Sequence, residues 1–119
     1  MEVFQEMGNE RHIAKIQALS EKKKTANIIK YAVHKDPELR CAAAAALGTI
    51  AQDESYNQLV LMTRDPELSV RKAAVAALGV MGRKAGADHV RHVMTHDTDP
   101  ELIKICETAV SQIVNSTSR

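Results

Sequence analysis

The stretch Val70-Arg-Lys-Ala-Ala-Val-Ala-Ala-Leu-Gly79 decides the fold, because its pattern occurs three times in the chain. It is preceded by a first copy, Leu39-Arg-Cys-Ala-Ala-Ala-Ala-Ala-Leu-Gly48, and followed by a fainter one, Leu102-Ile-Lys-Ile-Cys-Glu-Thr-Ala-Val-Ser111. Self-similarity at a period of about 20 to 50 residues is typical of proteins in which each repeat packs on the next. The spacing of the three copies falls within this range. The sequence therefore predicts a repeat array.

Each copy carries apolar residues at helical spacing. In the first copy they recur from Leu39 at intervals of 4, 3, 1 and 3 residues, which marks one face of a helix. An Asp-Pro-Glu start precedes each copy, and these residue types favour a helix N-terminus. The tetrapeptides 36–39 and 65–68 are identical but two residues out of phase with the copies. We follow the longer match, which makes Leu39, Val70 and Leu102 equivalent; we call them the anchors.

The pattern of an apolar residue, Arg, two variable residues and Ala, followed by Ala-Leu-Gly, resembles the HEAT repeat. It is most similar to the short Ala-rich variety related to phycobiliprotein lyases. The resemblance covers about residues 20–115. It implies an all-α fold, namely a short right-handed α-solenoid of about three helical hairpins plus an N-terminal capping helix.

The length of 119 residues predicts one domain, 1–119. We expect residues 1–19 to form a lead-in and a cap helix, with a break at Gly8-Asn9. Lys22-Lys-Lys24 is expected to open the next helix, whose apolar side includes Val33. The hairpins are then predicted at 20–51, 53–82 and 84–115, with a polar tail at 116–119.

The composition limits the classes of partner. Hydrophobic residues make up 45% and charged residues 26%, which excludes a disordered chain. The formal net charge of +1 gives no global field to attract nucleic acid or an anionic membrane. No apolar run approaches the roughly 18 residues of a membrane span, and no signal peptide is evident. We expect a cytoplasmic protein, a monomer or weak homodimer, that binds a protein and neither nucleic acid nor membrane.

The resemblance nominates a binding surface, because the second helices of HEAT hairpins line the concave side where partners dock. On each second helix, the residues two, five and six positions after the anchor lie opposite the buried stripe. Several of them, such as Val75, are apolar, and exposed apolar patches can mark interfaces. The alternative is that they serve helix propensity or pack on the adjacent helix. The predicted strip is Cys41, Ala44, Ala45, Lys72, Val75, Ala76, Lys104, Glu107 and Thr108.

Arg40 and Arg71 follow the first two anchors. The resemblance implies that an Arg at this position is structural and pairs with an Asp in a neighbouring inter-helix turn. Asp65 and Asp97 occupy such turns, so a packing role is favoured over ligand recognition for these four residues. The third copy has Ile103 instead of Arg.

Three histidines are the sharpest candidate for a metal site. His89, His92 and His96 are spaced so that they share one helical face, and three imidazoles can hold zinc. They are expected on a solvated face, however, and one straight helix does not easily bring three ring nitrogens to about 2.1 Å from one ion. We therefore predict no metal and no cofactor. Cys41 and Cys106 are expected to point in different directions, without a disulfide.

The chain lacks the motifs of enzymes that share this architecture. No His-Glu pair of the di-iron hydroxylase type occurs, and no Trp of the kind that DNA glycosylases use. We therefore predict a non-catalytic protein–protein interaction or scaffold module. The alternative, which rests on the lyase resemblance alone, is an accessory or chaperone-like subunit of a bilin-lyase-type enzyme that attaches a cofactor.

Overall fold

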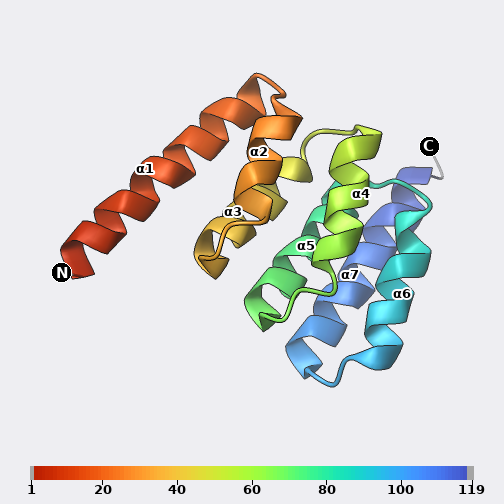
Figure 1. Cartoon of the computed structure of the whole chain (residues 1–119). Helices are drawn as coiled ribbons and strands as arrows, with labels where there is room; N and C mark the ends of the chain where they lie inside the picture. The colour runs from red at the N-terminus through yellow and green to blue at the C-terminus, as the bar shows by residue number, and fades with distance from the viewer. Residues whose placement is uncertain (1, 118–119) are drawn as a thin grey trace.

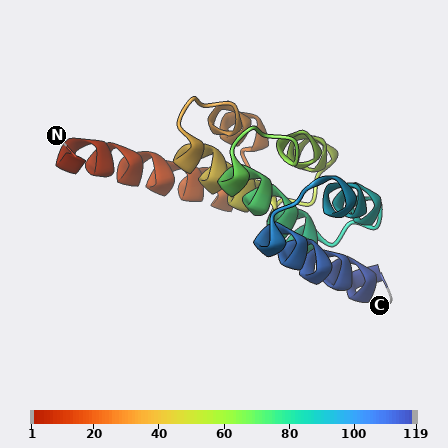
Figure 2. The same ribbon diagram turned by 90° about the horizontal axis from the view of Figure 1, so that it is seen from below.

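The computed structural model describes residues 2–117, with side chains for residues 9–116, and this part of the chain contains seven helices and no strand. The helices form two layers (Figure 1, Figure 2). In one layer α1, α3, α5 and α7 lie side by side, and in the other α2, α4 and α6 do. The chain is therefore a short helical solenoid, as predicted. The helices are α1 (Glu2–Glu21), α2 (Thr25–Ala32), α3 (Pro37–Leu47), α4 (Asp53–Met62), α5 (Leu68–Met81), α6 (Gly86–His96) and α7 (Pro100–Thr117).

The core lies between the two layers and follows the repeat register. The anchors Leu39, Val70 and Leu102 are 1%, 0% and 0% exposed. Leu68, the competing match to Leu39, is only half-buried. The anchor equivalence is confirmed, because the longer match predicts the buried position in all three copies. Helix α1 packs on α3 as α3 packs on α5, so it occupies the place of a second helix from a preceding repeat.

The glycine that ends each Ala-Leu-Gly motif allows neighbouring second helices to approach closely. A Cβ added at Gly48 would lie 2.9 Å from Ala77 Cβ and 3.0 Å from Ala77 Cα. A Cβ at Gly79 would lie 2.9 Å from Ala109 Cα. Such distances are too short for carbon atoms, so α3–α5 and α5–α7 pack at a separation that only glycine permits.

The predicted break at Gly8-Asn9 is wrong, because α1 is continuous from Glu2 to Glu21. A glycine inside a helix costs only about 1 kcal/mol. The Asn9 side chain donates a hydrogen bond of 3.0 Å to Glu38 on α3. Met1, the start of the predicted lead-in, lies outside the described residues.

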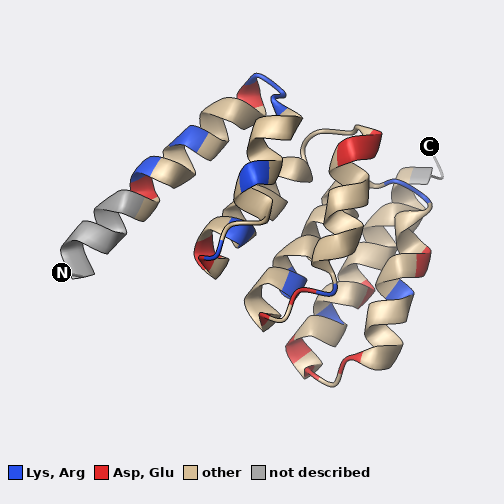
Figure 3. Ribbon diagram, viewed as in Figure 1, with Lys and Arg blue, Asp and Glu red and all other residues tan. Residues whose placement is uncertain are grey.

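The expected start of the second helix is also wrong. Lys22, Lys23 and Lys24 form the turn between α1 and α2, visible in blue in Figure 3, and α2 begins at Thr25. Since α2 ends at Ala32, Val33 does not join its apolar side and is 70% exposed.

The predicted polar tail is shorter than expected. Helix α7 continues to Thr117, so residues 116 and 117 are helical. Residues 118 and 119 of that tail lie outside the described part of the chain.

The close packing predicts a difference between two glycines. Gly48→Ala should lower the free energy of unfolding by about 1–3 kcal/mol, because the new methyl group meets the Ala77 backbone. Gly86→Ala is the matched control, since a Cβ there would have its nearest neighbour at 3.5 Å, and it should be neutral or stabilise by up to about 1 kcal/mol. Urea unfolding followed by circular dichroism measures both. Equal stabilities of the two variants would contradict the tight contact.

Candidate interaction surface

Two arginines join successive repeats at the start of the second helices. Arg40 donates from Nε and Nη2 to both carboxylate oxygens of Asp65, at 2.9 Å each. Arg71 donates from Nε to Asp97 at 3.0 Å. Each Nη1 also donates to a carbonyl in the turn that precedes its own helix: Arg40 to His34 O and Arg71 to Asp65 O, both at 2.9 Å. Each guanidinium therefore fastens one inter-helix turn to the next, and we call this arrangement the arginine ladder.

Asp65 and Asp97 both lie five residues before an anchor, and His34 occupies the same position in the first repeat. In all three repeats the side chain at this position accepts a hydrogen bond from the backbone amide two residues later. His34 Nδ1 accepts at 3.0 Å, Asp65 at 2.9 Å and Asp97 at 3.2 Å. The position five residues before the anchor explains why the identical tetrapeptides 36–39 and 65–68 are out of phase. Asp36 lies three residues before its anchor and caps α3, whereas Asp65 lies five residues before its anchor and accepts the hydrogen bonds of Arg40.

Both ladder carboxylates are held in the ionised form. Burial acts to raise the pKa of Asp65, but hydrogen bonds from Arg40 and the Glu67 amide, with the charges of Arg40 and Arg71, lower it below its usual value. The backbone amide of Asp99 and the nearby Arg71 lower the pKa of Asp97 in the same direction. The hydrogen-bonding capacity of these groups is directed inside the fold, which favours a structural role.

The structure corrects part of the predicted strip. Ala44 and Val75 are 0% exposed and cannot meet a partner. They lie one helical turn before Gly48 and Gly79, the residues that contact the next second helix, so position five faces that neighbour. The alternative of packing on the adjacent helix is therefore right for these two residues. In α7 no helix follows within the described chain, so Glu107 at the same position is exposed at the end of the stack.

Apart from Glu107, the remaining predicted residues share a surface with positions that sequence reasoning missed. Positions three, six and ten after each anchor recur at helical spacing and point away from the other layer, and position two lies at their edge. All twelve residues are exposed or half-buried. The signal in the sequence was Val80, an apolar residue four positions after Ala76. We call this surface the second-helix strip; it comprises Cys41, Ala42, Ala45, Thr49, Lys72, Ala73, Ala76, Val80, Lys104, Ile105, Thr108 and Gln112.

Two mostly apolar grooves lie along the strip. One, of about 460 Å³, runs between α1 and α3 and is lined by Ile13, Ile16, Ala42, Ala45 and Thr49 among others. The other, of about 400 Å³, runs between α5 and α7. Its apolar lining is Ala76, Val80 and Ile105, and its polar rim is Glu101, Lys104, Thr108 and Gln112. Lys72 is held beside this rim by Glu101 at 3.1 Å and Asp99 at 3.7 Å.

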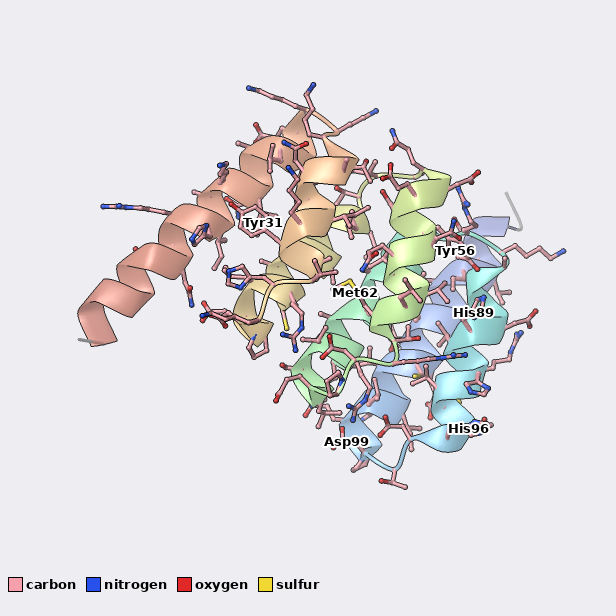
Figure 4. All side chains as sticks on the ribbon, viewed as in Figure 1. Tyr31, Tyr56, Met62, His89, His96 and Asp99 are labelled. Atoms are coloured by element: carbon pink, nitrogen blue, oxygen red, sulfur yellow. The ribbon has the colours of Figure 1, made fainter. Side chains whose placement is uncertain are left out.

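The three candidate metal ligands do not converge. His89 packs edge-on against Tyr56 with ring centroids 6.2 Å apart, whereas His92 and His96 stack on each other at 4.0 Å. Figure 4 shows His89 beside Tyr56 and His96 toward the other end of α6. Among the described side chains, no three His, Cys, Asp or Glu residues are arranged to hold a metal ion. The three histidines are therefore not gathered around one point on α6.

The two cysteines are free and lie in different environments. Cys106 is fully buried in the core, and burial raises the pKa of its thiol to about 11. A thiol with that pKa stays protonated near neutral pH and is a poor nucleophile. Cys41 is half-buried at the edge of the second-helix strip.

The family model for HEAT repeats matches residues 25–111, from the start of α2 into α7. The match includes all three copies of the motif. Because it is to HEAT repeats in general, the phycobiliprotein-lyase variety stays a prediction. Comparison with curated proteins finds no match. Within the described residues, none of the helices combines the length and the apolar character that crossing a membrane requires.

The ladder predicts acid-sensitive stability. The folded-state pKa of Asp65 lies below the ordinary value of about 3.9, so its contribution is complete above about pH 5 and is lost as the pH falls through the lowered pKa. Asp65→Asn should lower the free energy of unfolding at pH 7 by about 1–3 kcal/mol and make it depend less on pH between about 5 and 2. Urea unfolding across this range measures the effect.

The control for Asp65→Asn is Asp53→Asn, which removes the exposed partner of Arg83. A surface pair of this kind contributes little, so stability at pH 7 should barely change. An Asp65→Asn variant as stable as Asp53→Asn would show that the ladder carries no stability.

The cysteine environments predict selective thiol labelling. In the native protein at pH 8, Ellman's reagent should modify Cys41 and leave Cys106 unmodified, because Cys106 is buried and protonated. Both thiols should react in guanidinium chloride. Cys41→Ser should therefore abolish native labelling, and a thiol that still reacts quickly in this variant would contradict the buried position of Cys106.

Proposed function

Because the chain belongs to the HEAT-repeat family, we propose that it is a non-catalytic module that binds a protein partner through the second-helix strip. HEAT repeats generally mediate protein–protein interaction. Nothing in the family match specifies the partner, so the location of the binding surface has to be argued from the exposed side chains of this chain.

The observation that carries the proposal is the exposure of Val80 in the groove between α5 and α7. This side chain is 62% exposed, and the half-buried Ile105 lies in the same groove. Exposed apolar residues that share a groove with a polar rim are typical of interaction sites. The strip also offers the second groove at α1–α3, so an extended partner could contact several repeats at once.

The residue types of the strip suggest how recognition works. The small side chains at positions three and six leave shallow grooves, into which apolar side chains of a partner can insert. A groove of about 400 Å³ falls within the usual range for ligand sites, about 300–1,000 Å³. Glu101, Lys104 and Gln112 on the rim would fix the orientation of the bound segment through hydrogen bonds. Lys72, which is already paired, would contribute mainly its aliphatic stem.

The proposal predicts that Val80→Glu weakens partner binding. The substitution replaces apolar contact area with a charge that binding would desolvate, so the amount of partner captured should fall about fivefold or more. Affinity capture from extracts of the source cells, quantified by mass spectrometry, measures this loss. Because Val80 is exposed, the variant should keep the unfolding temperature of the unmodified protein.

Leu61→Glu is the matched control. Leu61 is 67% exposed but lies on α4 in the other layer, so capture should stay within about twofold of the unmodified protein. A photo-crosslinking residue at Thr108 should then label the same partner, whereas one at Asn57 on α4 should not. Undiminished capture by Val80→Glu, or equal loss in both variants, would refute binding at the strip.

A further inference from the structure

The net charge of +1 conceals a strong segregation of charge along the stack. Residues 9–35 contain seven Lys and Arg residues and two acidic residues, a net charge of +5. Residues 36–85 contain six of each and are neutral. Residues 86–116 contain two basic and five acidic residues, a net charge of −3. Glu2 and Glu6 precede these ranges and lower the net charge of residues 1–35 to +3. The N-terminal part of the chain is therefore basic, although the chain as a whole is nearly neutral.

Among the residues whose side chains the structure describes, no ion pair compensates the basic charges of residues 9–35. All seven of these cationic side chains are exposed. Between residues 36 and 116, five of the eight cations are paired: Arg40, Arg71, Lys72, Arg83 and Arg91. Cations in the repeats thus mainly serve the fold, whereas those at the N-terminal end face solvent.

Five of these cations are exposed and follow one another along α1 and the turn after it, and we call them the basic stripe: Arg11, Lys15, Lys22, Lys23 and Lys24. Arg11 and Lys15 are four residues apart, so they share one face of α1, and Lys22 follows directly after the last residue of that helix. The other two continue the stripe into the turn before α2 (Figure 3). Glu21 lies on a different side of α1, where it lines the groove toward α3. The basic stripe is therefore separate from the second-helix strip.

Local structure does not account for two of the three lysines in this turn. The amides of Lys23 and Lys24 bond back to the carbonyls of Ser20 and Leu19, a helix ending that favours glycine at the left-handed residue. Lys23 occupies that residue with φ 54°. Lys24 immediately precedes α2, where the helix dipole disfavours a cation. Lys22, in contrast, directly follows the last residue of α1, where the helix dipole favours a cation. Local structure therefore disfavours Lys23 and Lys24 but not Lys22, and the two disfavoured lysines point to a role outside the fold.

We propose that the basic stripe is a docking surface for a short acidic segment of a partner protein. Arg11 and Lys15 are about 6 Å apart along the helix axis, and Lys15 and Lys22 about 10 Å. Carboxylates on alternate residues of an extended chain are about 6.6 Å apart, so five or six residues can reach all three cations. This surface is independent of the second-helix strip, and either can fail without the other.

The charge distribution favours an acidic protein segment over a long polyanion. A nucleic acid duplex or a membrane would extend beyond the stripe toward the neutral and acidic repeats, which offer it no attraction. The neighbouring aromatic residue, Tyr31, is half-buried and its hydroxyl lies 3.2 Å from His12 Nδ1, so it offers no open face for base stacking. A short acidic segment needs only the stripe.

The test uses a fluorescein-labelled peptide made of six consecutive Glu-Ser units, with fluorescence anisotropy at 50 mM NaCl. We expect saturable binding that weakens at 300 mM NaCl, because exposed ion pairs are screened by salt. The triple variant Arg11→Gln/Lys15→Gln/Lys22→Gln should bind about tenfold more weakly. The corresponding peptide of Gln-Ser units should not bind.

The matched control, Lys35→Gln/Arg64→Gln/Lys84→Gln, removes the same charge from exposed cations that lie outside both surfaces and are unpaired among the described residues. It should change the affinity less than about twofold. Unchanged thermal unfolding of both triple variants excludes loss of the fold. Equal effects of the two triples, or no binding of the acidic peptide at millimolar concentration, would overturn the proposal. Tighter binding of a short DNA duplex would also overturn the proposal, in favour of nucleic acid as the ligand. Tighter binding of vesicles made from equal parts of phosphatidylserine and phosphatidylcholine would overturn it in favour of a membrane.

Discussion

The close contact between successive second helices is the constraint on which the rest of the structure depends. Gly48 lies against Ala77, and Gly79 lies against Ala109. Side chains of this size bring α3, α5 and α7 together and leave little room for larger residues between them. Small residue types, mainly alanine, also recur on the solvent side of these helices. The grooves of the second-helix strip are therefore shallow, and Val80 and Ile105 are the larger apolar groups in the groove between α5 and α7.

The second helices are fixed at both ends by different interactions. At their C-terminal ends the glycine contacts set the distance between repeats. At their N-terminal ends Arg40 and Arg71 join the inter-helix turns and set the register. The first repeat has His34 in the acceptor position, where it accepts only the local amide. Helix α1 reaches α3 through other groups, including the hydrogen bond from Asn9 to Glu38 and the buried side chain of Ile16.

The two proposed surfaces use different physical forces and lie on different sides of α1. The second-helix strip offers apolar grooves whose attraction is short-ranged and depends on shape. The basic stripe offers charges that form no ion pair with another described residue, and their attraction acts over about 10 Å at moderate salt. A partner that carried an acidic segment next to an apolar one could be oriented by the stripe before its apolar residues reached the strip.

The sequence by itself determined the elements and the core. Periodicity identified Leu39, Val70 and Leu102 as equivalent buried anchors and predicted helices without strands, because the spacing of apolar residues reflects the turn of the helix. The turn chemistry of single residues was less decisive: Gly8 did not break α1, because a glycine inside a helix costs only about 1 kcal/mol. Tertiary structure alone decided the surfaces. Helical spacing describes one buried face, whereas each second helix buries another against its successor, so Ala44 and Val75 are hidden and Val80 is exposed.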